Sequence, residues 1–204
     1  MHRKLEINMV DKSDSPSPSS ALQQIALVFR LIGWSSFWIQ LVLGVVSTIV
    51  LIFASLSRDV GPANQRSPGT GFGIVLAVSG VITLGLGVYL AFRYTRIGVR
   101  LKSTNPNNRP RKADTVQILR LGLIVNLVGT LVSIIGAQAI AGTLLLRSLS
   151  QPQGVGAAIY APGQINQGIR SVDIFVVQAN TNTVAAHFAG ILCSLWLLNR
   201  INRQ

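Results

Sequence analysis

Residues 34–56 read WSSFWIQLVLGVVSTIVLIFASL, a stretch of 23 residues without a single charge. An α-helix needs about 20 apolar residues to cross the hydrocarbon core of a bilayer. Three further stretches meet this requirement, at about 72–92, 118–146 and 172–198. The last two are long for one span, and tilt or extra turns beyond the bilayer would absorb the excess. The sequence therefore predicts an all-α integral membrane protein built as a four-helix bundle.

The composition of the whole chain agrees with a membrane protein. Of its 204 residues, 49% are hydrophobic and only 12% are charged, whereas soluble domains carry about 25% charged residues. The single cysteine, Cys193, excludes a disulfide within one chain. The sequence contains no nucleophile elbow, paired carboxylates, HExxH motif or phosphate loop. We therefore expect neither an enzyme nor a bound cofactor, and name no catalytic residue.

The basic residues are distributed unevenly around the four stretches. Of the 18 Lys and Arg residues, 14 lie before the first stretch, between the second and third, or after the fourth, if Arg120 near the start of the third is counted with the loop before it. Because cytoplasmic loops are enriched in Lys and Arg, we expect both termini in the cytoplasm. The net charge of +12 then indicates attraction to anionic lipids of the inner leaflet. We expect no nucleic-acid partner, because the basic loop 93–117 lacks interleaved aromatic residues.

Two segments precede the first span. Residues 1–19 contain the run SDSPSPSS and are predicted to form a disordered tail, so that the membrane domain covers 20–204. Residues 20–33 carry a capping box and a helical apolar face. We expect a bend near Gly33 and an N-terminal interfacial amphipathic helix over 20–33. The alternative is one straight helix that protrudes into the cytoplasm.

Polar residues recur within 172–198 at helical spacing. Asp173, Asn180 and His187 are seven residues apart, Thr183 extends their stripe, and Gln178 and Asn182 form a second polar pair. An ionisable residue inside a membrane is a functional hypothesis by default, so these six residues are candidates for a transport pathway or polar face. The alternative is a neutral histidine hydrogen-bonded to another helix.

A metal site within one chain is not expected. Asp173 and His187 are 14 residues apart, which is about 21 Å along a helix, too far to share one ion. One histidine, one distant aspartate and one cysteine are too few ligands for a tight site. Only an oligomer could bring several copies of His187 to one axis.

Small residues form a stripe on the third stretch. Gly122, Gly129 and Gly136 are seven residues apart, and Asn126 and Ser133 share their face. Such a face lets another helix approach closely, so we interpret it as a helix-packing surface, with a pore lining as the alternative. Because the stripe exceeds what a minimal bundle needs, we also expect a homo-oligomer.

Several runs of the sequence resemble one known family. They are RLIG with FWIQL near residues 30–41, GLIVNLVG at 122–129, and VDIFVVQANTNTVAAHFAGILCSLWLL at 172–198. The resemblance covers about 22–199 and is to the four-span chloroplast inner-envelope proteins known as "permease in chloroplasts". These are also described as subunits of the inner-envelope protein-import translocon, and they have cyanobacterial homologues.

The resemblance implies two competing functions, iron transport and participation in protein import. This chain lacks a long, acid-poor transit peptide at its start, so we expect a cyanobacterial protein of the plasma or thylakoid membrane. Our first hypothesis is a permease for a metal ion such as iron, or for a small solute. The alternative is a non-transporting scaffold or translocon accessory subunit with membrane-protein partners. The resemblance supplies no binding residues.

Overall fold

The computed structural model describes residues 20–59, 68–103, 105–150 and 171–203. These residues form four long α-helices and one short 3-10 turn: α1 (Ser20–Asp59), α2 (Pro68–Leu101), η2 (Pro106–Asn108), α3 (Lys112–Ser150) and α5 (Ser171–Asn202). Each long helix contains a segment long and apolar enough to cross a membrane. The predicted fold class, a bundle of four such helices, is confirmed. The predicted disordered tail, residues 1–19, lies outside the described residues.

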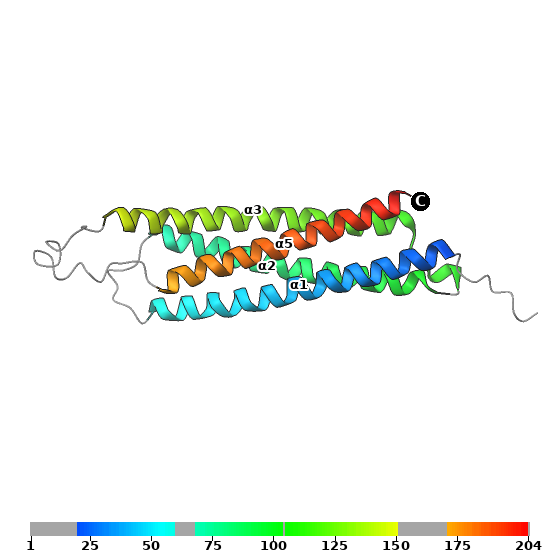
Figure 1. Cartoon of the computed structure of the whole chain (residues 1–204), viewed down its shortest axis with the longest axis horizontal. Coiled ribbons are helices and arrows are strands. Elements are labelled where there is room, and N and C mark those ends of the chain that lie inside the picture. The colour runs from blue at the N-terminus through cyan, green and yellow to red at the C-terminus, as the bar shows by residue number, and fades with distance from the viewer. Residues whose placement is uncertain (1–19, 60–67, 104, 151–170, 204) are drawn as a thin grey trace, which may run out of the picture.

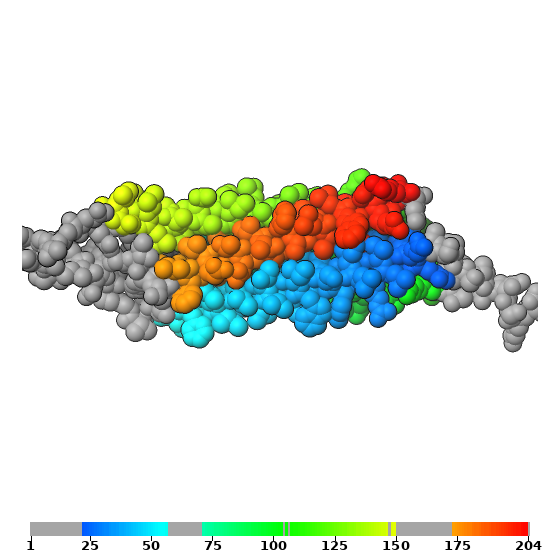
Figure 2. Space-filling view, viewed as in Figure 1, coloured from blue at the N-terminus to red at the C-terminus, as the bar shows by residue number. Residues whose placement is uncertain are grey.

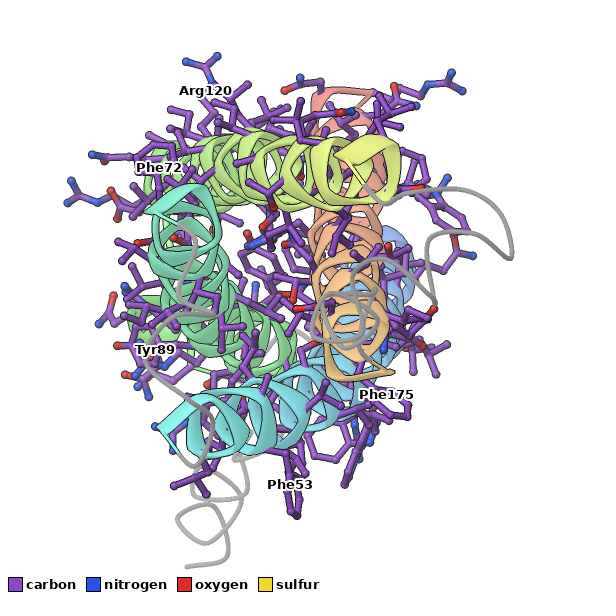
Figure 3. All side chains as sticks on the ribbon, turned by 90° about the vertical axis from the view of Figure 1, so that its left-hand side faces the viewer. Phe53, Phe72, Tyr89, Arg120 and Phe175 are labelled. Atoms are coloured by element: carbon purple, nitrogen blue, oxygen red, sulfur yellow. The ribbon has the colours of Figure 1, made fainter. Side chains whose placement is uncertain are left out.

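The helices are arranged as a ring in chain order. α1 packs on α2, α2 on α3, α3 on α5 and α5 on α1, and the end-on view shows this square arrangement (Figure 3). The start of α1, the α2–α3 connection and the end of α5 lie at one end of the bundle (Figure 1). We call this the basic end, because Arg96, Arg100, Arg111 and Lys112 lie in or beside that connection. The opposite end is called the far end.

The buried positions of the helices follow a coiled-coil spacing. On α3 the buried residues are separated by alternating steps of four and three: Thr115, Leu119, Gly122, Asn126, Gly129, Ser133, Gly136 and Ile140. The buried residues of α2 include the same register: Gly73, Ala77, Gly80, Leu84, Gly87, Ala91, Tyr94 and Gly98. This heptad repeat keeps one seam of each helix facing its neighbours along the whole bundle.

The structure of the first helix differs from the prediction of a separate interfacial helix over 20–33. Residues 20–59 form a single uninterrupted helix, so 20–33 is not a separate helix and Gly33 does not interrupt α1. The physical reason is that Gly33 serves close packing: a Cβ there would lie 3.1 Å from the backbone nitrogen of Thr95. Ile25 and Phe29 likewise pack in the core with Tyr94 and Ile97 of α2. The N-terminal segment is therefore part of the bundle.

Two apolar clusters fill the ends of the bundle. The cluster at the basic end contains Phe29, Leu90, Tyr94, Leu119 and Leu197 among its buried members. The cluster at the far end contains Leu51, Ala54, Ala77, Ile140, Val176 and Ala179. Between them the buried side chains are mostly polar, and nitrogen and oxygen atoms are visible inside the ring of helices (Figure 3). The ends of the core are thus apolar and its middle is polar.

The outer surface has the opposite character. Phe53, Phe72, Tyr89 and Phe175 point away from the bundle and are each more than half exposed (Figure 3). In the space-filling view α5 lies between α3 and α1, and the three helices form one continuous elongated face (Figure 2). Apolar exposure on all four helices is far larger than a soluble monomer tolerates, and it is the surface that lipid tails would cover.

Candidate functional site: a buried polar layer

Three helices contribute the polar side chains of the middle of the core. We call this group the polar layer, and its buried members are Ser36, Gln40 and Ser47 on α1, Asn126 and Ser133 on α3, and Asn180, Thr183, His187 and Ser194 on α5. The remaining helix, α2, contributes glycines at this level. Each of these side chains lies on the seam of its helix, so the heptad repeat of the sequence is what brings them together.

His187 lies at the centre of the layer and is fully buried. Its Nδ1 is 3.1 Å from Oδ1 of Asn126 on α3. Its Nε2 is 3.2 Å from the backbone carbonyl oxygen of Gly80 on α2. The Asn126 amide in turn donates from Nδ2 to the carbonyl oxygen of Gly122, at 2.8 Å. The imidazole therefore connects three helices through polar contacts.

Glycines provide the space for these large polar groups. A Cβ at Gly129 would overlap the His187 ring, and a Cβ at Gly190 would lie 2.6 Å from both Asn126 Oδ1 and Gln40 Nε2. Real Cβ atoms do not approach other atoms this closely, so a larger residue at either position would displace the ring or the amides. The polar layer thus depends on backbone positions without a side chain.

Toward the far end, the layer continues through hydroxyl and amide groups. Asn180 donates from Nδ2 to the carbonyl oxygen of Ser133, at 2.9 Å. Ser47 on α1 and Thr183 on α5 both donate to the carbonyl oxygen of Ala179, at 2.8 and 3.0 Å. These bonds tie α5 to α3 and to α1. Among the described residues, Ser133 Oγ and Asn180 Oδ1 have no partner.

Toward the basic end, the layer adjoins the apolar cluster. Gln40 donates from Nε2 to Ser36 Oγ at 2.9 Å, while Gln40 Oε1 has no partner among the described residues. The hydroxyl groups of Tyr94 and Ser194 are 3.3 Å apart. Tyr94 is only 2% exposed, and its hydroxyl occupies the space that a Cβ at Gly122 would take.

The structure separates the six polar candidates of the last helix. Asn180, Thr183 and His187 face the interior, and Asp173 is buried near the start of α5. Gln178 is exposed and donates to Asn182 Oδ1 at 3.1 Å, on the outer side of the helix. The i, i+4 pairing of these two amides was predicted, but they do not join the polar layer. The first turn of a helix favours a carboxylate such as that of Asp173.

The predicted packing stripe is buried as expected, but within the chain. Gly122, Asn126, Gly129, Ser133 and Gly136 are all buried in the bundle. A Cβ at Gly136, for example, would lie 3.1 Å from Leu76 Cβ of α2. This face is therefore not available to a second copy of the chain, because neighbouring helices of the same chain cover it. A homo-oligomer would have to use another surface.

Sequence reasoning missed the contribution of the first helix. Ser36, Gln40 and Ser47 lie on one face, four and seven residues apart, so their spacing in the sequence was a usable signal. The roles of Gly80, Gly87 and Gly190 could not be read in this way, because which residue fills the space beside a glycine depends on the neighbouring helix. No group of three or more His, Cys, Asp or Glu side chains occurs in the part of the chain that is described.

These features define the class of the protein as a multi-pass helical membrane protein with a polar core. The chain matches, over residues 19–202, a family described as "Protein of unknown function (DUF3611)", and it belongs to that family. It is 33% identical over 201 residues to "Protein TIC 21, chloroplastic" of Arabidopsis thaliana. The match covers 95% of this chain and 63% of that protein. No solved structure is significantly similar. The predicted resemblance to this group of chloroplast envelope proteins is confirmed.

Proposed function

We propose that this protein is a permease that moves a small polar solute or an ion through the interior of its bundle. The observation that supports the proposal is the polar layer, in which amide, hydroxyl and imidazole groups from three helices meet at the middle of the bundle. A bundle that only has to pack can fill its core with glycine, alanine and leucine. Burying histidine, asparagine and glutamine within a membrane is costly, and such residues typically mark pathways.

The two apolar clusters bear on how such a permease would work. They close the polar layer toward the basic end and toward the far end. We interpret the present conformation as an occluded one, in which the layer opens to neither side. Movement of a solute would then require the helices to separate at one end at a time, with the polar layer as the fixed site.

Iron is the substrate that the family resemblance implies, and the polar layer bears on that choice. It offers amide, hydroxyl and imidazole groups but, among the described residues, no cluster of carboxylates and thiols. Oxygen and imidazole ligands without such a cluster would favour weak, transient binding of a cation over tight retention. We propose iron(II) as the first metal to test, beside manganese(II) as a comparison.

The test is uptake into vesicles that contain the purified protein alone. Wild-type protein is expected to carry substrate, while His187→Gln and Asn126→Leu reduce the rate at least tenfold. Thr181→Ala is the matched control, because Thr181 is exposed on the same helix and its hydroxyl only donates to its own helix, at Val177 O. Equal rates in wild type and both core variants, or no uptake of any ion tested, would contradict the permease.

A second candidate function, a membrane scaffold or translocon accessory subunit, is favoured by a different observation. The glycines of the seams are covered by neighbouring side chains, which indicates a tightly packed unit. At the far end of α3, Leu145, Leu146 and Leu149 are 60 to 70% exposed and could contact a membrane-protein partner. Protein without any uptake activity that copurifies with such a partner would favour this function.

The distribution of basic residues supports an orientation of the bundle in the membrane. We propose that the basic end, with both termini, lies on the cytoplasmic side, where its Arg and Lys residues would contact anionic lipids. The support is that the α2–α3 connection carries exposed Lys102, Arg111 and Lys112 at the same end as Arg203. We further propose a cyanobacterial plasma or thylakoid membrane as the location, which the family resemblance supports.

A further inference from the structure

The two ring nitrogens of His187 both face oxygen atoms. Nε2 is 3.2 Å from Gly80 O, a carbonyl oxygen that can only accept a hydrogen bond. Nδ1 is 3.1 Å from Asn126 Oδ1. A neutral imidazole carries a proton on only one of its nitrogens. It can therefore donate to one of these oxygens and leaves a lone pair directed at the other.

The orientation of the Asn126 amide decides which form of the ring fits. Its Nδ2 donates to Gly122 O at 2.8 Å, so the oxygen Oδ1 is the atom turned toward His187. Turning the amide by 180° would offer Nδ2 to the ring but place Oδ1 against the Gly122 carbonyl oxygen. The arrangement with every polar atom of this group matched is the one in which both ring nitrogens carry protons.

We propose that His187 is an exchangeable proton-binding site inside the membrane, and that the Asn126 side-chain amide turns over when the proton leaves. With the proton bound, the ring donates to Asn126 and to Gly80. After release, Nε2 keeps its proton and donates to Gly80, while the rotated amide donates to Nδ1 and loses its bond to Gly122 O. The released proton passes to a water molecule, so the step balances without another reactant.

The surroundings of the ring favour exchange over permanent charge. At this level α2 and α3 contribute Gly80, Gly129 and Asn126, and the polar residues of α1 are a glutamine and serines, so the described residues here bring no carboxylate and no second cation. On α5 itself, Cys193 and Asp173 are six and 14 residues away, about 9 and 21 Å along the helix. Tyr94 lies at Gly122, one heptad from Gly129. Only dipoles hold the proton.

Unpartnered buried atoms flank the site on both sides along the bundle. Gln40 Oε1 lies beside Gly87, toward the basic end. Two more such atoms lie toward the far end: Ser133 Oγ of α3, beside Gly80, and Asn180 Oδ1 of α5. Each atom retains hydrogen-bonding capacity that a water molecule would meet. These are the positions through which a proton would reach or leave the ring.

The proton site deepens the proposed function, because it names the ion whose movement would be coupled to that of the solute. Its test does not require transport. If the protein binds and releases the proton but carries no solute, the proton site is supported and the permease function is contradicted. If the protein carries solute and His187 does not titrate, the permease function is supported and the proton site is contradicted.

The experiment is nuclear magnetic resonance of the full chain, labelled with ¹⁵N-histidine and ¹⁵N-asparagine, in lipid nanodiscs between pH 5 and 8. The chain has only two histidines, His2 and His187, and His187→Gln assigns their signals. His187 is expected to change from two protonated ring nitrogens to one across this range. The Asn126 side-chain amide should change with the same midpoint, since the two events are one exchange.

Two variants separate a proton site from a packing role. Asn126→Asp places a carboxylate beside Nδ1, so the doubly protonated ring should persist at pH 7.5. Asn126→Leu removes the acceptor, and at the same pH the singly protonated ring should dominate. His187 that holds one unchanged tautomer from pH 5 to 8 while His2 titrates would overturn the proposal. So would an identical titration in both variants.

Discussion

Gly129 offers the sharpest test of the packing that holds the polar layer in place. A Cβ there would overlap Cε1 and Nε2 of the His187 ring and lie 2.7 Å from its Nδ1. The ring cannot simply move away, because its nitrogens face Asn126 Oδ1 and Gly80 O at 3.1 and 3.2 Å. Gly129→Ala must therefore displace the ring or push α3 away from α5.

The cost can be estimated from these two consequences. Overpacking a well-packed core costs about 1 to 3 kcal/mol. Losing the two polar contacts of the ring adds about 0.6 kcal/mol each, the typical strength of a hydrogen bond within a membrane. Gly129→Ala should therefore lower the free energy of unfolding by about 2 to 4 kcal/mol. Gly129→Leu, with a larger side chain, should prevent folding or assembly.

The matched control is Gly142→Ala on the same helix, because nothing lies within 4 Å of a Cβ at Gly142. Alanine is a better helix former than glycine by up to about 1 kcal/mol, so this variant should be unchanged or slightly more stable. Stability can be measured in mild detergent by the reactivity of the partly buried thiol of Cys193 during unfolding. Equal stability of the two alanine variants would refute the packing argument.

Three further predictions concern topology, assembly and the basic end of the layer. A cysteine introduced at Gln204 or Asn107, in a Cys193→Ser background, should be shielded from membrane-impermeant reagents in intact cells; labelling at Gln204 without labelling at Asn107 would contradict the orientation. The expected homo-oligomer would have to form through the exposed apolar outer surface, because the glycine stripe of α3 is covered within the chain; a monomeric mass in both mild detergent and nanodiscs would argue against it. Tyr94→Phe should cost about 0.6 kcal/mol of stability, because it keeps the ring and removes the contact between the Tyr94 hydroxyl and Ser194 Oγ; a fully unfolded variant would contradict this, because it would show that the hydroxyl contributes far more than one contact.

The aromatic residues near the basic end show what the sequence leaves open. Trp34, Trp38, Tyr89, Tyr94 and Trp196 all lie in the half of the bundle nearer the basic end, and such residues are expected at the membrane interface. Four of them are about half exposed or more. Tyr94 is instead buried, because Gly122 of α3 leaves space for its hydroxyl. Nothing in the sequence around Tyr94 indicates which glycine it faces.

The amino-acid sequence by itself determined the class of fold, the four membrane helices and the face of each polar stripe. These follow from local properties, since apolar length sets a span and seven-residue spacing places Asn180 and His187 on one side of a helix. Only the tertiary structure decided that Gln40 and Asn126 share a layer with His187, and that the glycines of α3 are covered within the chain. The physical reason is that such contacts depend on which helices are neighbours and at what height along the bundle they pack. These residues are more than 60 positions apart in the sequence, and the local sequence around each does not determine which distant residue it will contact.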